Sequence, residues 1–275
     1  MKQEIGLLVV FLLVFLYDTF LPQRSGKHLP MFTAVLMFIF TLLGFCPHAL
    51  GTGDVTAFSG MYETSTVITA IKNILSIGVV IVLIQSTKWA NSDAIAVRRG
   101  EFYELMLVTL FGMYLMISAR HFLLFIIGLE SASLPLAAMV AMDKQSYESH
   151  EAAVKYMLTA VFSSAVFMMG LSFVYALSGT LYFEGIYLAI IGGKSTLLCI
   201  ALAFVISGIG FKLSLVPFHL WTADVYQGAP TPVTSYLSVI SKGAAAFAFL
   251  VILAQAFGAV YHQIWEWMLY ALIIL

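Results

Sequence analysis

The stretch GFKLSLVPFHLW, from Gly210 to Trp221, places a lysine, a proline and a histidine within an otherwise apolar run. The segment around it, 196–228, has 33 residues and no other strong helix-breaking signal. As one helix it would be about 50 Å long, whereas the hydrocarbon core of a bilayer is about 30 Å thick. Unwound backbone is tolerated inside a membrane only where it lines a cavity or is buried in protein. The stretch therefore predicts a discontinuous membrane helix, broken between Lys212 and His219.

Three residues of this stretch carry candidate chemistry. Pro217 has no N–H, so it leaves the carbonyl of Leu213 without its helical partner, directly beside Lys212. A lysine at the C-terminal end of a half-helix also meets the negative end of the helix dipole, and a buried lysine can release its proton. We expect Lys212 to be protonatable. His219 is a candidate relay because histidine titrates near neutral pH, and the alternative is an interfacial histidine beside Trp221.

The composition indicates an all-α polytopic membrane protein. The chain is 61% hydrophobic and 10% charged, with a mean hydropathy of +0.99, whereas soluble domains are about 45–50% apolar and about 25% charged. Long apolar runs satisfy their own backbone only as helices, so membrane lipid is the expected surrounding. The net charge of −1 does not favour a nucleic-acid partner. Cys46 and Cys199 lie in apolar runs, where we expect small core residues rather than a metal site or a disulfide.

Nine apolar runs predict the transmembrane helices. They are 5–21, 30–50, 66–87, 102–118, 121–142, 151–177, 196–216, 233–257 and 263 to the end. The last run is too short to span, so we expect the chain to be cut inside a helix at Leu275. Lysine and arginine concentrate in alternate loops, which predicts an external N-terminus. The internal loops would then carry Arg24, Lys27, Lys88, Arg98, Arg99 and Lys144, and the external segments Lys2, Arg120 and Lys194.

Five ionisable residues fall inside these predicted spans: Lys72, Glu130, Lys155, Lys212 and Lys242. A charge at mid-bilayer costs about 2.5–3.5 kcal/mol on insertion scales, and such residues commonly mark proton relays. Five in one chain predict an internal polar path. The alternative is that they pair with one another only to hold helices together.

Individual positions give these charges different roles. Glu130 is flanked by small residues, and Lys155 lies on the next helix, which a short loop makes antiparallel. They lie about 18 Å and about 6 Å from the loop end, so we expect an approach through side chains or a bridging water rather than an assured direct ion pair. Lys242 is mid-span beside serines and small residues, where it could exchange a proton. Lys72 is near a helix end, and we expect it to snorkel toward the membrane surface.

Three stretches of the sequence resemble a known family. GFKLSLVPFHLWTADVYQGAPTPVTSYLSVISK, from Gly210 to Lys242, closely resembles the subunit N family of the proton-pumping NADH:quinone oxidoreductase, respiratory complex I, one of its antiporter-like membrane subunits. GLESASLPL around Glu130 and EAAVKYMLTAVFSSAVFMMG around Lys155 resemble the same family. The resemblance covers about residues 95–260, and the first three helices match only in character. Ala223 departs from the pattern, because the family usually has a second proline there, and we expect a looser turn without loss of function.

The resemblance implies an antiporter-like bundle of about nine transmembrane helices whose second inverted repeat is truncated. It divides the chain into an N-terminal three-helix segment at 1–95, a first five-helix repeat at 96–260 and the start of a further helix at 261–275. It implies proton-transfer roles for site residues. Glu130 and Lys155 would be a coupled charge pair, Lys212 the central protonatable lysine, Lys242 the onward site and His219 a candidate relay.

The implied function is proton translocation coupled to quinone reduction, as a subunit of an NADH:quinone oxidoreductase translocase in the bacterial inner membrane. The sequence has no Gly-rich phosphate loop, metal-ligand cluster or haem-ligand pair, so we expect no cofactor in this subunit. FMN, iron–sulfur clusters, NADH and quinone would act elsewhere in the complex, and neighbouring antiporter-like membrane subunits would be the partners. One alternative is a subunit of a multisubunit cation/proton antiporter or membrane-bound hydrogenase. Another is a structural membrane anchor.

Overall fold

The structure is a computed structural model of the chain, and it describes residues 1–20, 28–46, 55–92, 95, 97–191 and 196–274. Its elements are α1 (Lys2–Phe20), α2 (Leu29–Phe45), β1 (Val55–Ala57), β2 (Tyr62–Thr64), α3 (Thr66–Ala90), α4 (Arg99–Ile117), α5 (Phe122–Val140), α6 (Tyr147–Ser178), α7 (Phe183–Ile190), α8 (Thr196–Leu213), α9 (Leu220–Gly228), α10 (Thr231–Ser235), the π-helix η3 (Tyr236–Ser241), α11 (Lys242–Gln255), the 3₁₀-helix η4 (Gly258–Gln263) and α12 (Trp265–Ile274). Within the described ranges, seven helices are long and apolar enough to cross a membrane, with α10, η3 and α11 counted as one, and α2 and α12 are shorter apolar helices. These are the nine predicted runs, and the all-helical multi-pass prediction is confirmed.

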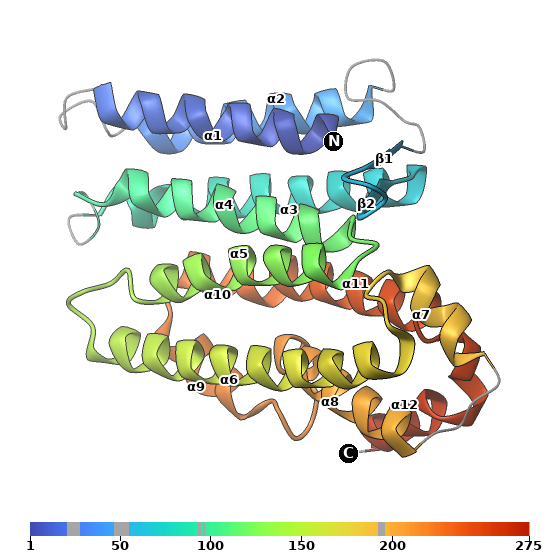
Figure 1. The fold of residues 1–275 in the computed structure, drawn as a ribbon. Coiled ribbons are helices and arrows are strands. Elements are labelled where there is room, and N and C mark those ends of the chain that lie inside the picture. The colour runs from blue at the N-terminus through green and yellow to red at the C-terminus, as the bar shows by residue number, and fades with distance from the viewer. Residues whose placement is uncertain (21–27, 47–54, 93–94, 96, 192–195, 275) are drawn as a thin grey trace.

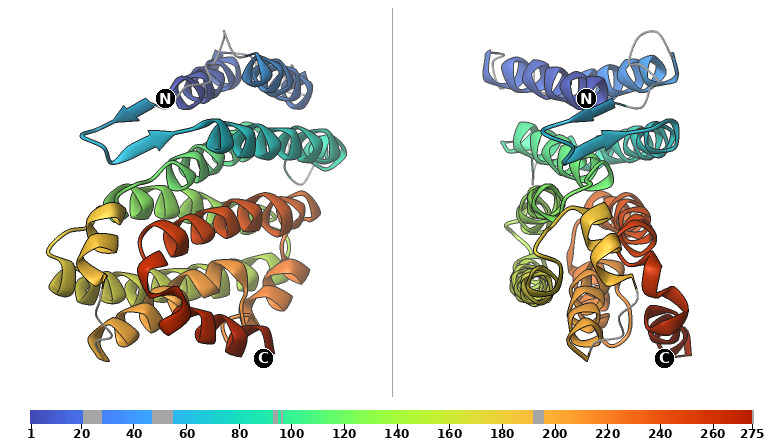
Figure 2. Two further views of the ribbon diagram at one scale, coloured as in Figure 1. Left: turned by 90° about the vertical axis from the view of Figure 1, so that its right-hand side faces the viewer. Right: turned by 45° about the vertical axis from the view of Figure 1, so that its right-hand side comes forward.

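The helices lie in stacked layers (Figure 1). In the outer layer α1 packs beside α2, and this pair covers α3 and α4. Next come α5 and the continuous α10–α11 helix, both against α4, and the opposite layer is formed by α6, α8 and α9 (Figure 2). The site described below lies between these last two layers.

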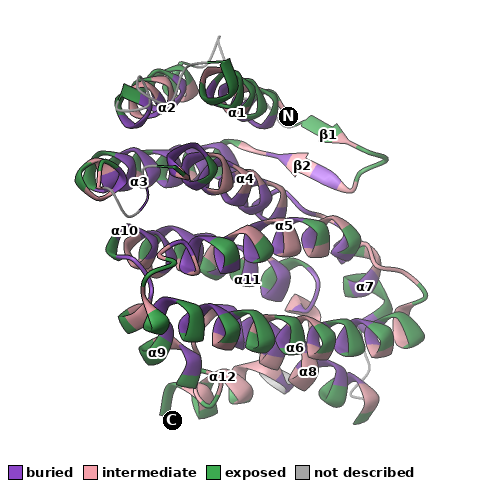
Figure 3. Cartoon of the chain, turned by 90° about the vertical axis from the view of Figure 1, so that its left-hand side faces the viewer, coloured by how far each residue is buried: buried purple, intermediate pink, exposed green. Residues whose placement is uncertain are grey.

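Apolar side chains cover the outside of the bundle. Figure 3 shows exposed residues along α6. Val154, Leu158 and Phe162 are exposed at four-residue spacing, so they share one face of this helix. A helix that turns an apolar face outward is suited to lipid rather than water. Cys46 and Cys199 are also exposed and free, so the prediction that they are core residues is wrong. In a membrane protein an apolar run has no fixed inward face, because lipid accepts small apolar side chains as readily as the core does.

Glycines allow α4 and α5 to approach closely. A Cβ atom added at Gly112 would lie 2.5 Å from the backbone nitrogen of Ala132. One added at Gly128 would lie 2.6 Å from the backbone nitrogen of Met116. Small residues at such crossings let two backbones touch. This contact positions α5, which carries two residues of the site.

A β-hairpin and the short helix α7 were not predicted. The two strands have three residues each, too few for an alternating pattern to show, and residues 58–60 turn the chain with positive φ angles. The hairpin is attached to the α4–α5 connection, where the Glu63 amide donates to the Ser118 carbonyl at 2.9 Å and Arg120 donates to the Glu63 carboxylate at 2.7 Å. The hydrogen bond from Arg120 lowers the pKa of Glu63, although partial burial opposes it.

The predicted helix break is confirmed. α8 ends at Leu213 and α9 begins at Leu220, so the break lies between Lys212 and His219. The connector contains a cis peptide between Val216 and Pro217. Lys212 therefore sits in the last turn of α8, at the negative end of its dipole.

The physical reason for the break differs from the one that we predicted. Ser214 has a positive φ of 58°, its amide donates to the Phe211 carbonyl at 3.0 Å, and the Leu215 amide donates to the Gly210 carbonyl at 2.8 Å. This pair of bonds is a Schellman cap, which ends a helix by satisfying its last carbonyls. α8 has thus ended before Pro217, and the proline occupies the connector rather than interrupting a helix.

The predicted orientation depends on loop charges that the structure covers only in part. Arg24, Lys27 and Lys194 lie outside the described residues. The external N-terminus therefore stays a prediction. So does the division into segments 1–95, 96–260 and 261–275.

Candidate functional site

Lys212 is a buried ammonium group surrounded by hydroxyl groups. Its side chain, on a residue that is 5% exposed, donates to the Ser133 hydroxyl of α5 at 2.8 Å and to the Tyr156 hydroxyl of α6 at 3.2 Å. The Lys212 nitrogen also lies 5.9 Å from the centre of the Tyr156 ring. No carboxylate in the described ranges forms an ion pair with it at 4.0 Å or less. The ammonium group is therefore hydrogen-bonded by neutral hydroxyl groups and is not part of an ion pair among the described residues.

Glu130 is an acidic residue whose charge acts on this lysine. It lies on α5, three residues before Ser133, and is half-buried. Its charge acts on both Lys212 and the Tyr156 hydroxyl without direct pairing to either among the described residues. Glu130 therefore contributes to the site through the electrostatic field of its carboxylate.

Lys155 is paired elsewhere. Its nitrogen lies 2.5 Å from a carboxylate oxygen of Asp224 on α9 and 2.7 Å from one of Glu151, one turn earlier on α6. No ion pair joins it to Glu130 in the part of the chain that the structure describes, and the approach of these two residues through side chains or a bridging water stays a prediction. The difference in depth already made a direct ion pair uncertain, and Asp224 is at the same level as Lys155. A polar cavity of about 210 Å³ adjoins them, lined by Glu148, Glu151, Ala152, Lys155, Asp224, Gln227 and Gly228.

Lys242 is the first residue of α11 and directly follows the π-helix η3. It is half-buried, and its nitrogen lies 5.2 Å from the centre of the Tyr226 ring of α9. Such a distance permits a cation–π interaction. π-Helical turns inside longer helices frequently occur at functional sites. η3 changes the angular position of Lys242 relative to a regular helix.

A row of aromatic side chains connects the two lysines. The ring centre of Tyr156, the partner of Lys212, lies 5.3 Å from that of Trp221, and Trp221 lies 6.3 Å from Tyr226 beside Lys242. The Tyr226 hydroxyl is buried and has no hydrogen-bond partner among the described residues. A buried hydroxyl of this kind is a natural position for a bound water. The row thus brings two hydroxyl groups into the space between Lys212 and Lys242.

Two other predicted residues lie apart from this group. His219 is exposed at the beginning of α9, and no polar contact joins it to Lys212 among the described residues. Lys72 is 0% exposed and forms an ion pair with Glu4 of α1, so the prediction that it snorkels is wrong. A position near a helix end does not reveal that a second helix covers it.

Comparison with known proteins agrees with this architecture. The family model for the transmembrane subunits of NADH:quinone oxidoreductase and the Mrp antiporter matches residues 119–275. The chain belongs to this family. The match includes Glu130, Lys155, Lys212 and Lys242 and begins just before α5.

Individual family members are similar over nearly the whole chain. The NADH-quinone oxidoreductase subunit N of Phocaeicola vulgatus is 48% identical over 96% of the chain, and that of Azobacteroides pseudotrichonymphae is 45% identical over 100%. These alignments cover 54% and 57% of the two relatives, so the chain spans about half their length. A solved structure of respiratory complex I from Thermus thermophilus superposes with a TM-score of 0.73 and 30% identity, over 90% of this chain and 52% of that one.

A more distant structure shows how widely the family fold is shared. A chain of the Mrp complex from Dietzia matches with a TM-score of 0.78 at 16% identity, over 96% of this chain and 50% of that one. At this identity the match concerns the fold alone. The fold is therefore common to subunits of different membrane complexes, and assignment among them depends on sequence identity.

Sequence reasoning missed Asp224 and Glu4. Asp224 lies 69 residues from Lys155, and Glu4 lies 68 residues from Lys72, so no local spacing signals either pair. Glu151 could have been found, because Glu and Lys four residues apart lie on the same helix face. No group of three or more His, Cys, Asp or Glu side chains placed to hold a metal ion occurs in the described ranges.

The ion pair between Lys155 and Asp224 predicts a specific coupling. In a double-mutant cycle on thermal stability, Lys155→Met and Asp224→Asn should be non-additive, whereas Lys155→Met and Glu130→Gln should be additive. Contacting residues couple and separated ones do not. Both side chains of the pair are about half exposed, at 42% and 52%, so the coupling should be small and should weaken as salt is added. Coupling confined to the Glu130 cycle would contradict the structure.

Proposed function

We propose that the chain acts as a proton-translocating, antiporter-like membrane subunit of an NADH:quinone oxidoreductase in the bacterial inner membrane. Buried lysines and Glu130 would change protonation when quinone is reduced elsewhere in the complex. The observation that carries the proposal is the Lys212 ammonium, buried at a helix break and held by hydroxyls rather than by an acid. Burial favours the neutral amine, whereas the helix end and Glu130 favour the cation. Opposed effects let a modest change in nearby charge move a proton.

The proton would pass from Lys212 toward Lys242. Tyr156 already accepts a hydrogen bond from Lys212, and the unpartnered Tyr226 hydroxyl lies on the Lys242 side. Each hydroxyl can accept one proton and donate another, with bound water completing the gaps. Lys155 and its acidic partners would influence the site from the α6–α9 side. His219 remains a candidate relay at the exposed end of the break.

Redox chemistry would take place in other subunits. FMN, iron–sulfur clusters, NADH and quinone are expected there, and this chain would hold none of them. Its partners would be other membrane subunits, especially neighbouring antiporter-like ones. The chain's own contribution would be to bind, hold and release protons.

Two alternatives remain. A subunit of a cation/proton antiporter or a membrane-bound hydrogenase has the same fold, but the 45–48% identity to subunit N relatives favours the oxidoreductase. A structural anchor would use its buried charges only for packing. It predicts that Lys212→Ala reduces assembly but leaves the protons moved per quinone unchanged in the complexes that form.

Affinity purification of the tagged full-length protein from native membranes tests the assignment. We expect it to retain NADH-oxidising activity sensitive to quinone-site inhibitors. Recovery with antiporter subunits and without NADH oxidation would reject the oxidoreductase. A complex with NADH oxidation whose proton yield is insensitive to Lys212→Ala would support the anchor.

A further inference from the structure

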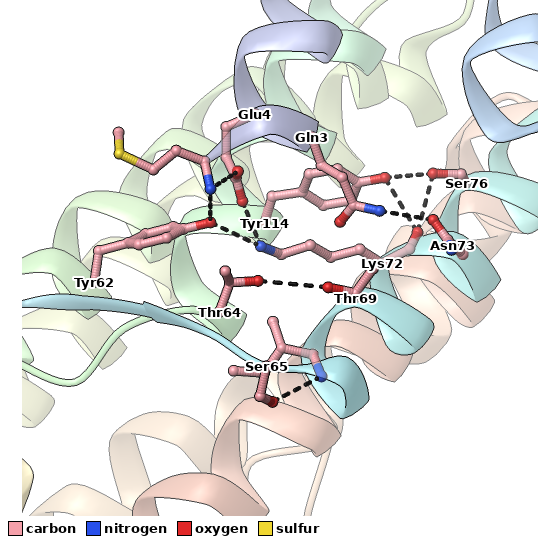
Figure 4. A network of polar contacts seen from close by, with 12 residues as sticks. Gln3, Glu4, Tyr62, Thr64, Ser65, Thr69, Lys72, Asn73, Ser76 and Tyr114 are labelled. Carbon is pink, nitrogen blue, oxygen red and sulfur yellow. Dashed lines mark hydrogen bonds and ion pairs between the residues drawn. The ribbon is translucent and has the colours of Figure 1, made fainter. Parts of the chain in front are cut away.

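A second buried charge pair lies outside the Lys212 site. Lys72 of α3 and Glu4 of α1 are 0% and 3% exposed, and the Lys72 nitrogen bonds directly to a Glu4 carboxylate oxygen (Figure 4). The pair joins the outermost helix to the second layer. Ionisable residues buried away from water are costly, and strongly perturbed ones gather at functional sites. Nothing in the proposed path from Lys212 to Lys242 uses these two.

Aromatic rings and hydroxyls surround the Lys72 nitrogen. It lies 5.3 Å from the ring centre of Tyr62 and 5.6 Å from that of Tyr114. It also donates a long hydrogen bond of 3.4 Å to the Tyr62 hydroxyl. The Met1 amino nitrogen donates to the same hydroxyl at 2.9 Å. These are the titratable groups that face the pair.

The hydrogen bonding of the pair is incomplete. Within the described residues the second carboxylate oxygen of Glu4 is buried and accepts no hydrogen bond, although the Met1 amino nitrogen forms an ion pair with it at 3.3 Å. A buried ion pair is stable only when further hydrogen bonds serve both ions. If one proton moves from nitrogen to oxygen, both groups become neutral, and the cost of burying two charges is replaced by the smaller cost of burying two neutral polar groups. The two forms of the pair therefore compete, and surrounding charge can select between them.

Buried hydroxyls lead from this pair toward the proposed proton path. The Tyr114 hydroxyl bonds to Ser76 and, at 3.1 Å, to the backbone carbonyl of Lys72. Tyr114 is close enough to Tyr236 of η3 for their hydroxyls to interact electrostatically. Tyr236 in turn receives a 2.7 Å hydrogen bond from Thr109. η3 ends directly before Lys242, so these hydroxyls extend from the pair toward that lysine.

We infer that Glu4 and Lys72 form a second proton-exchange site, whose charge state influences Lys242. In one step an N–H bond of the Lys72 ammonium breaks and an O–H bond forms on Glu4, which converts two ions into an amine and a carboxylic acid. The neutral amine can then take a proton from the Tyr62 hydroxyl while that hydroxyl takes one from a water molecule, which leaves the ammonium beside a neutral acid. Glu4 then gives its proton to a second water molecule, which restores the ion pair. This inference rests on the proposed function.

The test uses vesicles that contain the assembled complex with the full-length chain. Lys72→Arg keeps a cation beside Glu4, but guanidinium does not release a proton at accessible pH. The double variant Glu4→Gln/Lys72→Gln keeps hydrogen-bonding groups but has no proton to exchange. Lys88→Arg, at an exposed lysine in the last turn of the same helix, is the control. Acidification per quinone reduced and infrared difference spectra of the carboxyl region are measured.

We expect Lys72→Arg and the double variant to lose part of the acidification per quinone, and Lys88→Arg to retain all of it. The double variant should also lose a carboxylic-acid carbonyl band that wild type shows during turnover. The inference is overturned if all wild-type carboxyl bands remain in the double variant, or if Lys72→Arg acidifies at the wild-type ratio. If Lys72→Arg does not assemble with the complex, the result for the double variant alone decides the question. If neither variant assembles, the inference is overturned, and the pair serves as a structural contact. Lys212→Arg in the same vesicles separates the two proposals, because a wild-type ratio there rejects the proposed function itself.

Discussion

Lys212→Arg should assemble with the complex and stop proton transfer through this chain. Arginine preserves the positive charge at the end of α8 and can bond to the Ser133 and Tyr156 hydroxyls. Its guanidinium does not release a proton in the working pH range. Loss of a positioned proton-transfer group costs roughly 100-fold or more in the rate of that step. Lys212→Ala should give the same loss and should also reduce assembly, because it leaves a cavity and unpaired hydroxyls.

Vesicles energised with NADH provide the measurement. Quinone reduction and internal acidification are recorded together, and the amount of assembled complex is determined separately. Lys88→Arg should match wild type in all three. If Lys212→Arg moves as many protons per quinone as wild type, proton release from Lys212 is not part of the mechanism.

Gly112→Leu should prevent stable packing of α4 against α5. Even the first atom of the new side chain would lie 2.5 Å from the Ala132 nitrogen and 2.8 Å from the Gly128 carbonyl oxygen. Overpacking typically costs about 1–3 kcal/mol, and a clash with backbone cannot be relieved by a change of rotamer. Because α5 carries Glu130 and Ser133, the displacement would also separate the Ser133 hydroxyl from Lys212. We therefore expect a lower thermal midpoint in detergent and little assembled complex.

Gly243→Ala is the matched control for that substitution. A Cβ atom there would meet only a methyl carbon of Leu75, at 3.7 Å, which is an ordinary contact. Alanine also favours the helix relative to glycine. The control should keep or slightly raise the midpoint. Equal midpoints for Gly112→Leu and wild type would show that α4 and α5 do not cross as closely as described.

The sequence alone determined the class of the protein, its nine apolar helices and the break after Lys212. The helices follow from a local requirement, because each spanning segment must satisfy its own backbone. The break was indicated by Lys212, Pro217 and His219 within an apolar run, since length alone does not require one and α6 is unbroken over 32 residues. The charged residues of the site could also be predicted, because a lysine or glutamate stands out in an apolar run whichever way its side chain points. The hairpin could not be predicted, because its three-residue strands are stabilised by the α4–α5 connection rather than by a pattern of their own.

Only the tertiary structure decided which of these charges meet. Lys155 pairs with Asp224 instead of Glu130, and Lys72 pairs with Glu4 instead of reaching the membrane surface. The partners are far apart in sequence, and their meeting depends on the depth and rotation of separate helices. Amino-acid composition constrains neither the depth nor the rotation of a helix. Both sides of an apolar helix in lipid can be hydrophobic, so hydropathy does not show which side faces inward. The packing of the helices therefore determined which buried charges pair.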